Sequence, residues 1–316
     1  MKVYRTTLCA GITRTKEFER KKLAAFAVNV GTKCGHDCRY CSTGALLRMH
    51  RSFAEAGESP FGHGFAIVDP TTPGRVARDA RRIRRRGMVQ LCTTVDAWSP
   101  EAQDHSLGRR CLEAILFESE WTVRILTKNA AVLQDFDLIK DYRDRVLVGL
   151  SITATSDQTD VISSIEPYAS PIPDRMAVLR EAHALGLRTY AMFCPLLPGI
   201  ADAPDQIDEL VRFAAECGAE EIFTEPVNPR GSGLQMTQKA LEAHGWPKKA
   251  AGVGAVRRAE VWSRYVTHLI SNMQRSVREI SDIEKLRLLL YPSRLPAAAV
   301  ARIRQDDAGV VWLGKN

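Results

Sequence analysis

Three cysteines in one short segment are the residues of this sequence best suited to metal chemistry. The segment VNVGTKCGHDCRYCSTG (28–44) places Cys34, Cys38 and Cys41 with three and then two residues between them. In a loop, this spacing can turn three thiolates toward one centre, which suits a soft metal or an iron-sulfur cluster. Three ligands would leave one iron of a cubane open, whereas a structural zinc site is normally closed by a fourth ligand.

Zinc is the alternative metal for this loop. His36 inside the motif, or His50 shortly after it, could complete a tetrahedral zinc site. Because Cys-x3-Cys is an uncommon spacing for zinc ligands, an iron-sulfur cluster is the preferred interpretation.

The elements that must position this loop follow a repeated pattern along the chain. Short runs rich in Val, Ile, Leu, Phe or Thr predict six β-strands, because they are too short for buried helices. Amphipathic segments between the strands predict helices. The predicted strands cover 23–30, 88–95, 122–128, 145–153, 188–196 and 219–227, and the predicted helices cover 73–86, 105–119, 131–142, 174–186 and 203–218.

This alternation predicts the fold class. Strands that alternate with helices form parallel sheets with right-handed crossovers. We therefore expect an α/β protein with a partial (β/α)6 barrel of the TIM type and a C-terminal helical appendage, in which 254–280 forms one long helix. The expected division is an N-terminal extension over 1–22, the barrel over 23–230 and the appendage over 231–316.

Polar residues follow the predicted strands, at the edge where the chemistry of such barrels collects. They are Cys34 after the first strand, Thr93, Thr94 and Asp96 after the second, Lys128 after the third, Ser151 and Thr153 in the fourth, Cys194 in the fifth and Glu225 in the sixth.

Composition narrows the class of protein further. The 316 residues are 45% hydrophobic, which is enough to bury a large core. The sequence has no long apolar run of membrane-spanning or signal-peptide type, so we expect a cytoplasmic protein without a membrane partner. The net charge of +7 favours polyanionic partners such as nucleic acid, and seven arginines within 75–87 either contact a polyanion or face solvent.

The cysteine loop after the first strand resembles the radical S-adenosylmethionine superfamily. The resemblance implies that Cys34, Cys38 and Cys41 hold a 4Fe-4S cluster whose open iron binds S-adenosylmethionine. An electron from a reductase or flavodoxin-type donor would pass through the cluster and split the cofactor into methionine and a 5′-deoxyadenosyl radical. Tyr40 takes the aromatic position that packs against adenine in this family.

The rest of the chain resembles the spore photoproduct lyase and DNA repair photolyase-like branch. The resemblance covers roughly residues 25–230 and rests on CTTVDAWSP (92–100), ILTKNAAVLQDFDLI (125–139), GLSIT (149–153), IEPYASPIPDRMAVLREAHALGL (165–187) and CPLLPGIAD (194–202). It implies that Lys128, Thr93 and Thr94 bind the methionine end of the cofactor, and that Ser151 binds its carboxylate or ribose. Glu166 and Arg175 are expected to form a structural ion pair.

Cys92 is the candidate catalytic residue. It matches the strand end at which spore photoproduct lyases carry a cysteine that returns a hydrogen atom to the product radical. The alternative is a buried thiol that packs as a small hydrophobic group.

The substrate stays open, because fold and cofactor do not fix it. One hypothesis is repair or modification of nucleic acid, with spore photoproduct as the most concrete case. Another is a radical enzyme of the same branch that acts on RNA, a modified nucleoside or a peptide, and a third is a non-catalytic metal protein that binds nucleic acid.

Overall fold

The computed structural model describes residues 1–229 and 231–314, and in this part of the chain nine strands form one large sheet. The strands are β2 (Thr13–Arg14), β3 (Phe26–Val28), β6 (Met88–Leu91), β7 (Thr122–Thr127), β8 (Val146–Ser151), β9 (Arg188–Leu196), β10 (Ile222–Pro226), β11 (Leu286–Leu290) and β12 (Val310–Trp312). Their spatial order is β12-β11-β10-β9-β8-β7-β6-β3-β2. All neighbouring pairs from β3 to β12 are parallel, and β2 pairs antiparallel at one edge. The predicted α/β partial barrel is confirmed.

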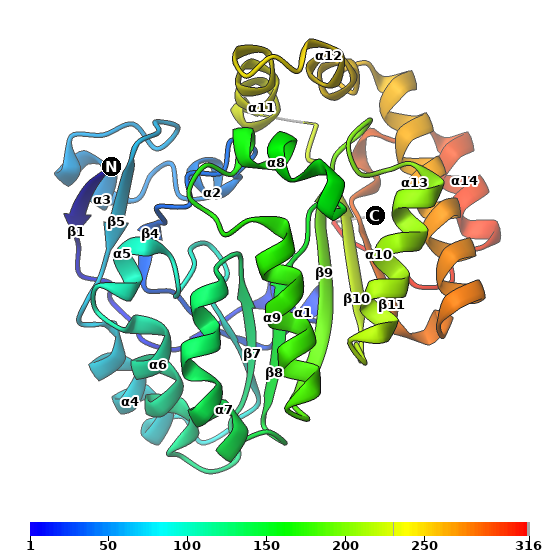
Figure 1. The fold of residues 1–316 in the computed structure, drawn as a ribbon. Helices are drawn as coiled ribbons and strands as arrows, with labels where there is room; N and C mark the ends of the chain where they lie inside the picture. The colour runs from blue at the N-terminus through cyan, green and yellow to red at the C-terminus, as the bar shows by residue number, and fades with distance from the viewer. Residues whose placement is uncertain (230, 315–316) are drawn as a thin grey trace.

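Helices cover the outer face of this sheet (Figure 1). They are α4 (Thr72–Arg82), α6 (Leu107–Leu116), α7 (Phe136–Asp141), α9 (Ile172–Ala184), α10 (Pro204–Glu216), α13 (Ala259–Ile280) and α14 (Ala297–Gln305). Every residue of β8 is buried, which explains its continuous apolar sequence VLVGLS, since both faces of this strand are covered. The helices and the outward side chains of the strands form one large core, called here the outer core.

Two elements differ from the sequence-based expectation. Strands β11 and β12 extend the parallel sheet, although they come from the segment expected to be a helical appendage. The long helix expected over 254–280 is present as α13 but begins at Ala259, and the first two residues of the expected range belong to α12 (Pro247–Ala255), with a turn between the two helices. Gly252 and Gly254 weaken the helix just before this break.

The inner face of the sheet carries a second cluster of side chains, called here the inner cluster. It consists of Leu23, Leu147, Tyr190, Met192, Phe223, Leu289, Val311 and Leu313, with Phe18, Leu126 and Cys194 packed against it. Phe18 belongs to α1 (Lys16–Arg20), so the N-terminal segment fills the interior of the barrel. Gly149 on β8 permits this packing, because an added Cβ atom would lie 2.2 Å from the Tyr190 ring.

A small second sheet supports the cysteine loop. It has the order β1-β5-β4, with β1 (Lys2–Arg5), β5 (Phe65–Val68) and β4 (Gly31–Lys33). The segment 48–65 contains α3 (Arg51–Ala56) and leads into β5. Phe53, Phe65 and Ile67 form the core of this sheet. Because β4 runs straight into the three cysteines, the metal-binding loop is anchored on a sheet of its own.

Three short elements surround the carboxyl end of the barrel. They are α2 (Thr43–Leu46), α8 (Thr159–Ile165) and α11 (Ser232–Ala243), which gather at the top of the molecule (Figure 1). Gly233 at the start of α11 approaches the cysteine loop so closely that a Cβ atom there would lie 2.8 Å from the Tyr40 carbonyl oxygen. No helix within the described residues is long and apolar enough to span a membrane.

Candidate active site

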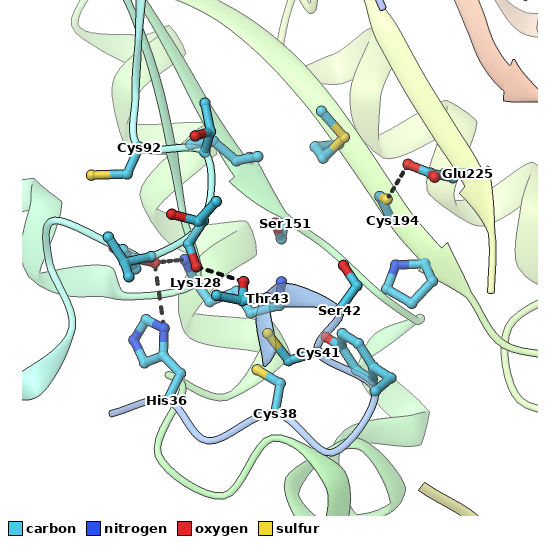
Figure 2. A pocket seen from close by; sticks show the side chains of 18 of the residues that line it. His36, Cys38, Cys41, Ser42, Thr43, Cys92, Lys128, Ser151, Cys194 and Glu225 are labelled. Carbon is cyan, nitrogen blue, oxygen red and sulfur yellow. Dashed lines mark hydrogen bonds and ion pairs between the residues drawn. The ribbon is translucent and has the colours of Figure 1, made fainter. Parts of the chain in front are cut away.

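The carboxyl ends of the barrel strands surround a cavity of about 280 Å³, called here the main cavity (Figure 2). Every residue predicted to bind a cofactor or take part in catalysis lines it. These residues are Cys34, Cys38, Tyr40, Cys41, Cys92, Thr93, Thr94, Lys128 and Ser151. Residues from four separate stretches of the sequence therefore meet at one place.

Hydrogen bonds hold the cysteine loop between β4 and α2. The Gly35 N–H donates to both carboxylate oxygens of Glu101 at 3.0 Å. The Arg39 N–H donates to the Ile165 carbonyl at 2.9 Å. Glu101 lies in α5 (Pro100–Gln103) and Ile165 is the last residue of α8, so two helices fix the path of the loop.

The donor set of this loop fits an iron-sulfur cluster. Cys34, Cys38 and Cys41 all border the main cavity, and all three also border a second cavity of about 40 Å³. Burial raises the pKa of the Cys34 thiol and raises that of Cys38 to about 12, so metal binding must displace their protons. Among the described residues, no three His, Cys, Asp or Glu side chains are already assembled as a metal site. Three thiolates beside two cavities suit an iron-sulfur cluster, because its iron and sulfide atoms would occupy the space between the ligands.

The two histidines considered as zinc ligands occupy different places. The ring of His50 caps α3, with Nδ1 accepting from the Ser52 N–H at 3.3 Å. His36 is buried and lines the main cavity beside the thiols. Its Nδ1 lies 3.4 Å from Asp96, and its Nε2 has no hydrogen-bond partner among the described residues. Of these two histidines, His36 is the one placed to interact with a group bound by the cysteines.

Asp96 joins the ends of β6 and β7 to the cysteine loop. Its carboxylate accepts hydrogen bonds from Thr127 Oγ1 at 2.9 and 3.0 Å and from the Lys128 N–H at 2.9 Å. It also accepts from the Trp98 N–H at 2.9 Å, and it faces His36. A single buried acid therefore fixes the backbone from which the Lys128 side chain extends.

Asn29 fixes the turn that contains Thr93 and Thr94. Its side-chain oxygen accepts from the N–H groups of both threonines at 2.9 Å, and its Nδ2 donates to Thr93 Oγ1 at 2.9 Å. Thr43 Oγ1 donates to the Thr94 carbonyl at 2.7 Å. Both backbone N–H groups already donate to Asn29. The turn can therefore contact a ligand only through its side chains.

A buried ion pair lies behind the cofactor-facing residues. Glu166 and Arg175 form the expected pair, and Glu166 also accepts a hydrogen bond from the Tyr40 hydroxyl. Arg175 donates to the Ser151 carbonyl at 3.0 Å. Lys128 Nζ lies 5.7 Å from the centre of the Tyr40 ring. Burial alone would lower the pKa of Lys128, but the Glu166 carboxylate outweighs this effect and raises the pKa, so the side chain stays an ammonium.

The two thiols at later strand ends point in different directions. Cys92, directly after β6, is only 3% exposed and packs in the outer core, where burial and then Cys111 raise its thiol pKa. Cys194 on β9 packs against the inner cluster and is partly exposed in the main cavity. Figure 2 shows the Cys92 sulfur turned away from Ser151 and Lys128, and Cys194 beside Glu225.

A lysine from the N-terminal segment completes the wall formed by β9 and β10. The Cys194 thiol donates to Glu225 Oε2 at 3.6 Å, and Lys21 Nζ donates to the same oxygen at 3.2 Å. Lys21 also lies 5.5 Å from the centre of the Tyr291 ring. Burial would lower the pKa of Lys21, but Glu225 raises it above its ordinary value, so this pair is charged.

These features define a class of protein. A parallel barrel with a Cys-x3-Cys-x2-Cys loop at its carboxyl edge, opening on a cavity that polar side chains from several strand ends line, is the architecture of radical S-adenosylmethionine enzymes. Residues 28–214, more than half of the chain, match the sequence profile of the Radical SAM superfamily. The chain belongs to this superfamily and is a radical SAM enzyme. Its members use an iron-sulfur cluster and S-adenosylmethionine.

The more particular resemblances are to proteins of viruses, archaea and bacteria. An uncharacterized protein of Acidianus two-tailed virus is 26% identical over 223 residues, which are 68% of this chain and 71% of the viral protein. One from Methanocaldococcus jannaschii is 25% identical over 190 residues, 60% of this chain and 67% of that protein. One from Mycobacterium tuberculosis is 25% identical over 209 residues, 66% of this chain and 60% of that protein.

Solved structures of spore photoproduct lyase have the same fold. The enzyme complexed with dinucleoside spore photoproduct matches with a TM-score of 0.57 and 16% identity, over 88% of this chain and 79% of the lyase. A variant with bound AdoMet and the same dinucleoside matches with a TM-score of 0.58 and 16% identity, over 88% and 78% of the two chains. The predicted superfamily is confirmed, and the predicted likeness to spore photoproduct lyase is confirmed for the fold.

Three residues that organise the site had no place in the sequence-based interpretation. Asn29 left a detectable trace, because an amide stands between valines in the strand pattern VNV. Glu101 follows Ser99 and Pro100, a pattern typical of a helix start, which gave no hint of its bond to Gly35. Lys21 sits among other charged residues, and only the fold brings it to Glu225.

Proposed function

We propose that this protein reductively cleaves S-adenosylmethionine at a 4Fe-4S cluster held by Cys34, Cys38 and Cys41, and that the radical formed acts on a nucleic acid or nucleoside. The observation that carries the proposal is the main cavity, which the three cysteines share with polar residues from several strand ends. The bound cluster supplies the electron that breaks the S–C5′ bond.

The chain's own residues would bind and orient the cofactor. The Lys128 ammonium, held beside the Tyr40 ring, is suited to the methionine carboxylate, since a charge-assisted hydrogen bond is among the strongest polar contacts. Ser151 is buried at the end of β8 and would bind the carboxylate or the ribose, while the Thr93 and Thr94 side chains border the methionine end. Tyr40 would pack against adenine.

Two observations support a nucleotide substrate. The chain carries a net charge of +7, which favours phosphate-bearing partners. It also shares its fold with a lyase whose structure contains a dinucleoside. Repair of a thymine dimer such as spore photoproduct is the most concrete form of this proposal.

The position of the arginine-rich segment favours a second candidate, a substrate other than long DNA. Arg82, Arg84 and Arg85 are exposed, and no partner holds their side chains within the described residues. Arg82 is the last residue of α4, and Arg84 and Arg85 lie between α4 and the start of β6, at the amino end of the barrel. The main cavity opens at the carboxyl end, so these charges do not guide a polyanion toward it. A nucleoside, a short RNA or a peptide would not need them.

The test begins with anaerobic reconstitution of the full chain with iron and sulfide. After reduction with dithionite, or with a flavodoxin-type donor, S-adenosylmethionine should yield 5′-deoxyadenosine and methionine. Stoichiometric zinc without iron uptake, or a reduced cluster that yields no 5′-deoxyadenosine, would contradict the proposal. Addition of irradiated DNA, RNA, nucleosides or peptides would then show which class accelerates turnover.

A further inference from the structure

The thiol of Cys194 has no role in the proposed function, although it lies in the main cavity with the cofactor residues. It belongs to β9 and faces the inner side of the barrel, together with Met192 two residues earlier. Strand side chains two residues apart share a face, so this orientation follows from the strand itself. Lys128 lines the same cavity.

Cys92 differs from Cys194 in the surroundings of its sulfur. It packs between the sheet and the helices, in the outer core that also contains Cys111 of α6. Its exposed fraction is 3%, and its sulfur is directed away from Ser151 and Lys128 in Figure 2. Both residues line the main cavity, but the Cys194 thiol is the more exposed of the two and is the one better placed to meet a small molecule there.

We infer that Cys194, and not Cys92, donates a hydrogen atom to carbon radicals formed in the main cavity, an inference that rests on the proposed function. The S–H bond of a thiol is weaker than the C–H bond that forms, so the transfer runs toward the quenched carbon. The carbon radical takes the hydrogen atom of Cys194 and becomes a closed-shell C–H group, which leaves a thiyl radical on the sulfur. One electron from the low-potential donor that serves the cluster, with one proton from solvent, restores the thiol.

Glu225 and Lys21 act as positioning residues for this step. The Glu225 carboxylate accepts the S–H hydrogen at an S···O distance of 3.6 Å, and Lys21 balances its charge at 3.2 Å. Burial, and then Glu225, raise the pKa of Cys194, so the sulfur carries its hydrogen at neutral pH. This protonation state is required, because a thiolate has no hydrogen atom to give.

An isotope experiment without substrate tests the inference on the reconstituted full chain. In D₂O the thiol becomes S–D, whereas carbon-bound hydrogens of the protein do not exchange. When S-adenosylmethionine is cleaved without substrate, the 5′-deoxyadenosyl radical is quenched within the cavity, and mass spectrometry reads how much deuterium the 5′-deoxyadenosine carries. We expect labelled product from the wild type and from Cys92→Ser, and loss of the label in Cys194→Ser, whose O–H bond is too strong to donate.

The outcomes separate the inference from the proposed function. Label that persists in Cys194→Ser, or that disappears in Cys92→Ser, overturns the assignment to Cys194 while cleavage of the cofactor stands. Unlabelled product from the wild type also overturns it. Absence of 5′-deoxyadenosine from a reduced, iron-loaded wild type overturns the proposed function, and the inference with it.

A second readout needs neither cluster nor activity. The folded protein without cluster is treated briefly with N-ethylmaleimide, and modified cysteines are identified by peptide mass spectrometry. Both cysteines border the cavity, but Cys194 is partly exposed whereas Cys92 is 3% exposed and packs in the outer core, so Cys194 should be modified well before Cys92. Modification of Cys92 at an equal or faster rate would overturn the inference. Cys111, buried in the same core, is the matched unreactive control.

Discussion

The two ends of the barrel are both rich in charged residues, but they use these charges differently. At the carboxyl end, Lys21 and Lys128 border the main cavity and remain charged there. At the amino end, Arg145 donates to the backbone carbonyls of Leu116, Glu118 and Trp121 at 3.0, 2.6 and 2.8 Å. A charge that is fully used by the protein's own backbone stabilises the fold, whereas one that faces a cavity is available to a ligand.

Inside the barrel, too, charged residues that bond to the protein itself are separated from those that face the main cavity. Arg124 lies below the main cavity, where it donates to Glu221 at 2.6 Å and stacks 4.6 Å from the centre of the Tyr190 ring. Arg287 Nε is 3.3 Å from the same carboxylate. Tyr190 and Phe223 belong to the inner cluster next to this network. The floor of the barrel is thus a closed structural layer, and the open chemistry is confined to the carboxyl end.

Substitution of a cluster cysteine at the carboxyl end should have the largest effect on activity. Cys34→Ala should abolish binding of the iron-sulfur cluster and all formation of 5′-deoxyadenosine, because one iron loses its thiolate. The fold should persist, since Glu101 and α8 hold the loop without metal. Iron analysis after reconstitution and far-UV circular dichroism measure these two effects.

Cys9→Ala is the matched control for this prediction. Cys9 is exposed and does not border either described cavity near the loop. Its loss should leave iron content and cofactor cleavage unchanged. A Cys34→Ala protein with wild-type iron content would show that the loop is not the cluster site.

At the carboxyl end, the buried Glu166–Arg175 ion pair stabilises the fold. Arg175→Met should lower the free energy of unfolding by about 3–5 kcal/mol, because it leaves a buried carboxylate without its partner. The Glu166 pKa is lowered in the folded wild type because Arg175 and Lys128 outweigh the effect of burial. The pair therefore stabilises the wild type above the ordinary carboxyl pKa of 4.5, and this stabilisation is lost as pH falls below that value.

Urea unfolding between pH 7 and pH 3 measures both effects. Wild-type stability should fall on acidification. In Arg175→Met the unpaired carboxylate has a raised pKa, so protonation relieves the buried charge and stability should rise or stay level. Parallel pH profiles of the two proteins would contradict this account.

Arg145→Met tests the amino end alone. It leaves backbone carbonyls without their donor, and it should lower the free energy of unfolding by about 3 kcal/mol. Cofactor cleavage per folded molecule should not change, since Arg145 lies at the far end from the main cavity. Urea unfolding and a 5′-deoxyadenosine assay on the same preparation measure the two quantities. A loss of cleavage without a loss of stability would contradict the division between the two ends.

Lys128→Met should show the opposite pattern. Loss of a charge-assisted hydrogen bond to the methionine carboxylate costs about 1.5–3 kcal/mol, so the KM for S-adenosylmethionine should rise about 10- to 100-fold. The free energy of unfolding should fall by less than in Arg175→Met, because Arg175 keeps its direct contact with Glu166. Lys140→Met, on the exposed side of α7, is the matched control and should alter neither quantity. An unchanged KM would remove Lys128 from the cofactor site.

The sequence predicted which residues gather around the main cavity where local pattern and sheet geometry decide. Lys128 and Ser151 were placed together because each ends a parallel strand, and parallel strands end at one edge. It could not give a side chain's direction where that direction depends on a turn or a distant partner. The sulfur of Cys92 lies after β6 has ended, so strand alternation no longer sets its direction, and Lys21 meets Glu225 only because α1 fills the barrel. Strands β11 and β12 were missed because they follow the long helix α13, beyond the regular alternation of strands and helices from which the barrel was predicted.

The exposed arginines at the amino end give the smallest expected effect. Arg84→Ser combined with Arg85→Ser should leave stability and cofactor cleavage unchanged, because neither side chain has a partner to lose within the described residues. Surface substitutions of this kind alter stability by about 0.5 kcal/mol or less. If the substrate enters only from the carboxyl end, acceleration of turnover by an added nucleic acid should also be unchanged. A reduced response, measured at two salt concentrations, would show that a polyanion reaches around the barrel and that the amino end serves substrate binding as well as structure.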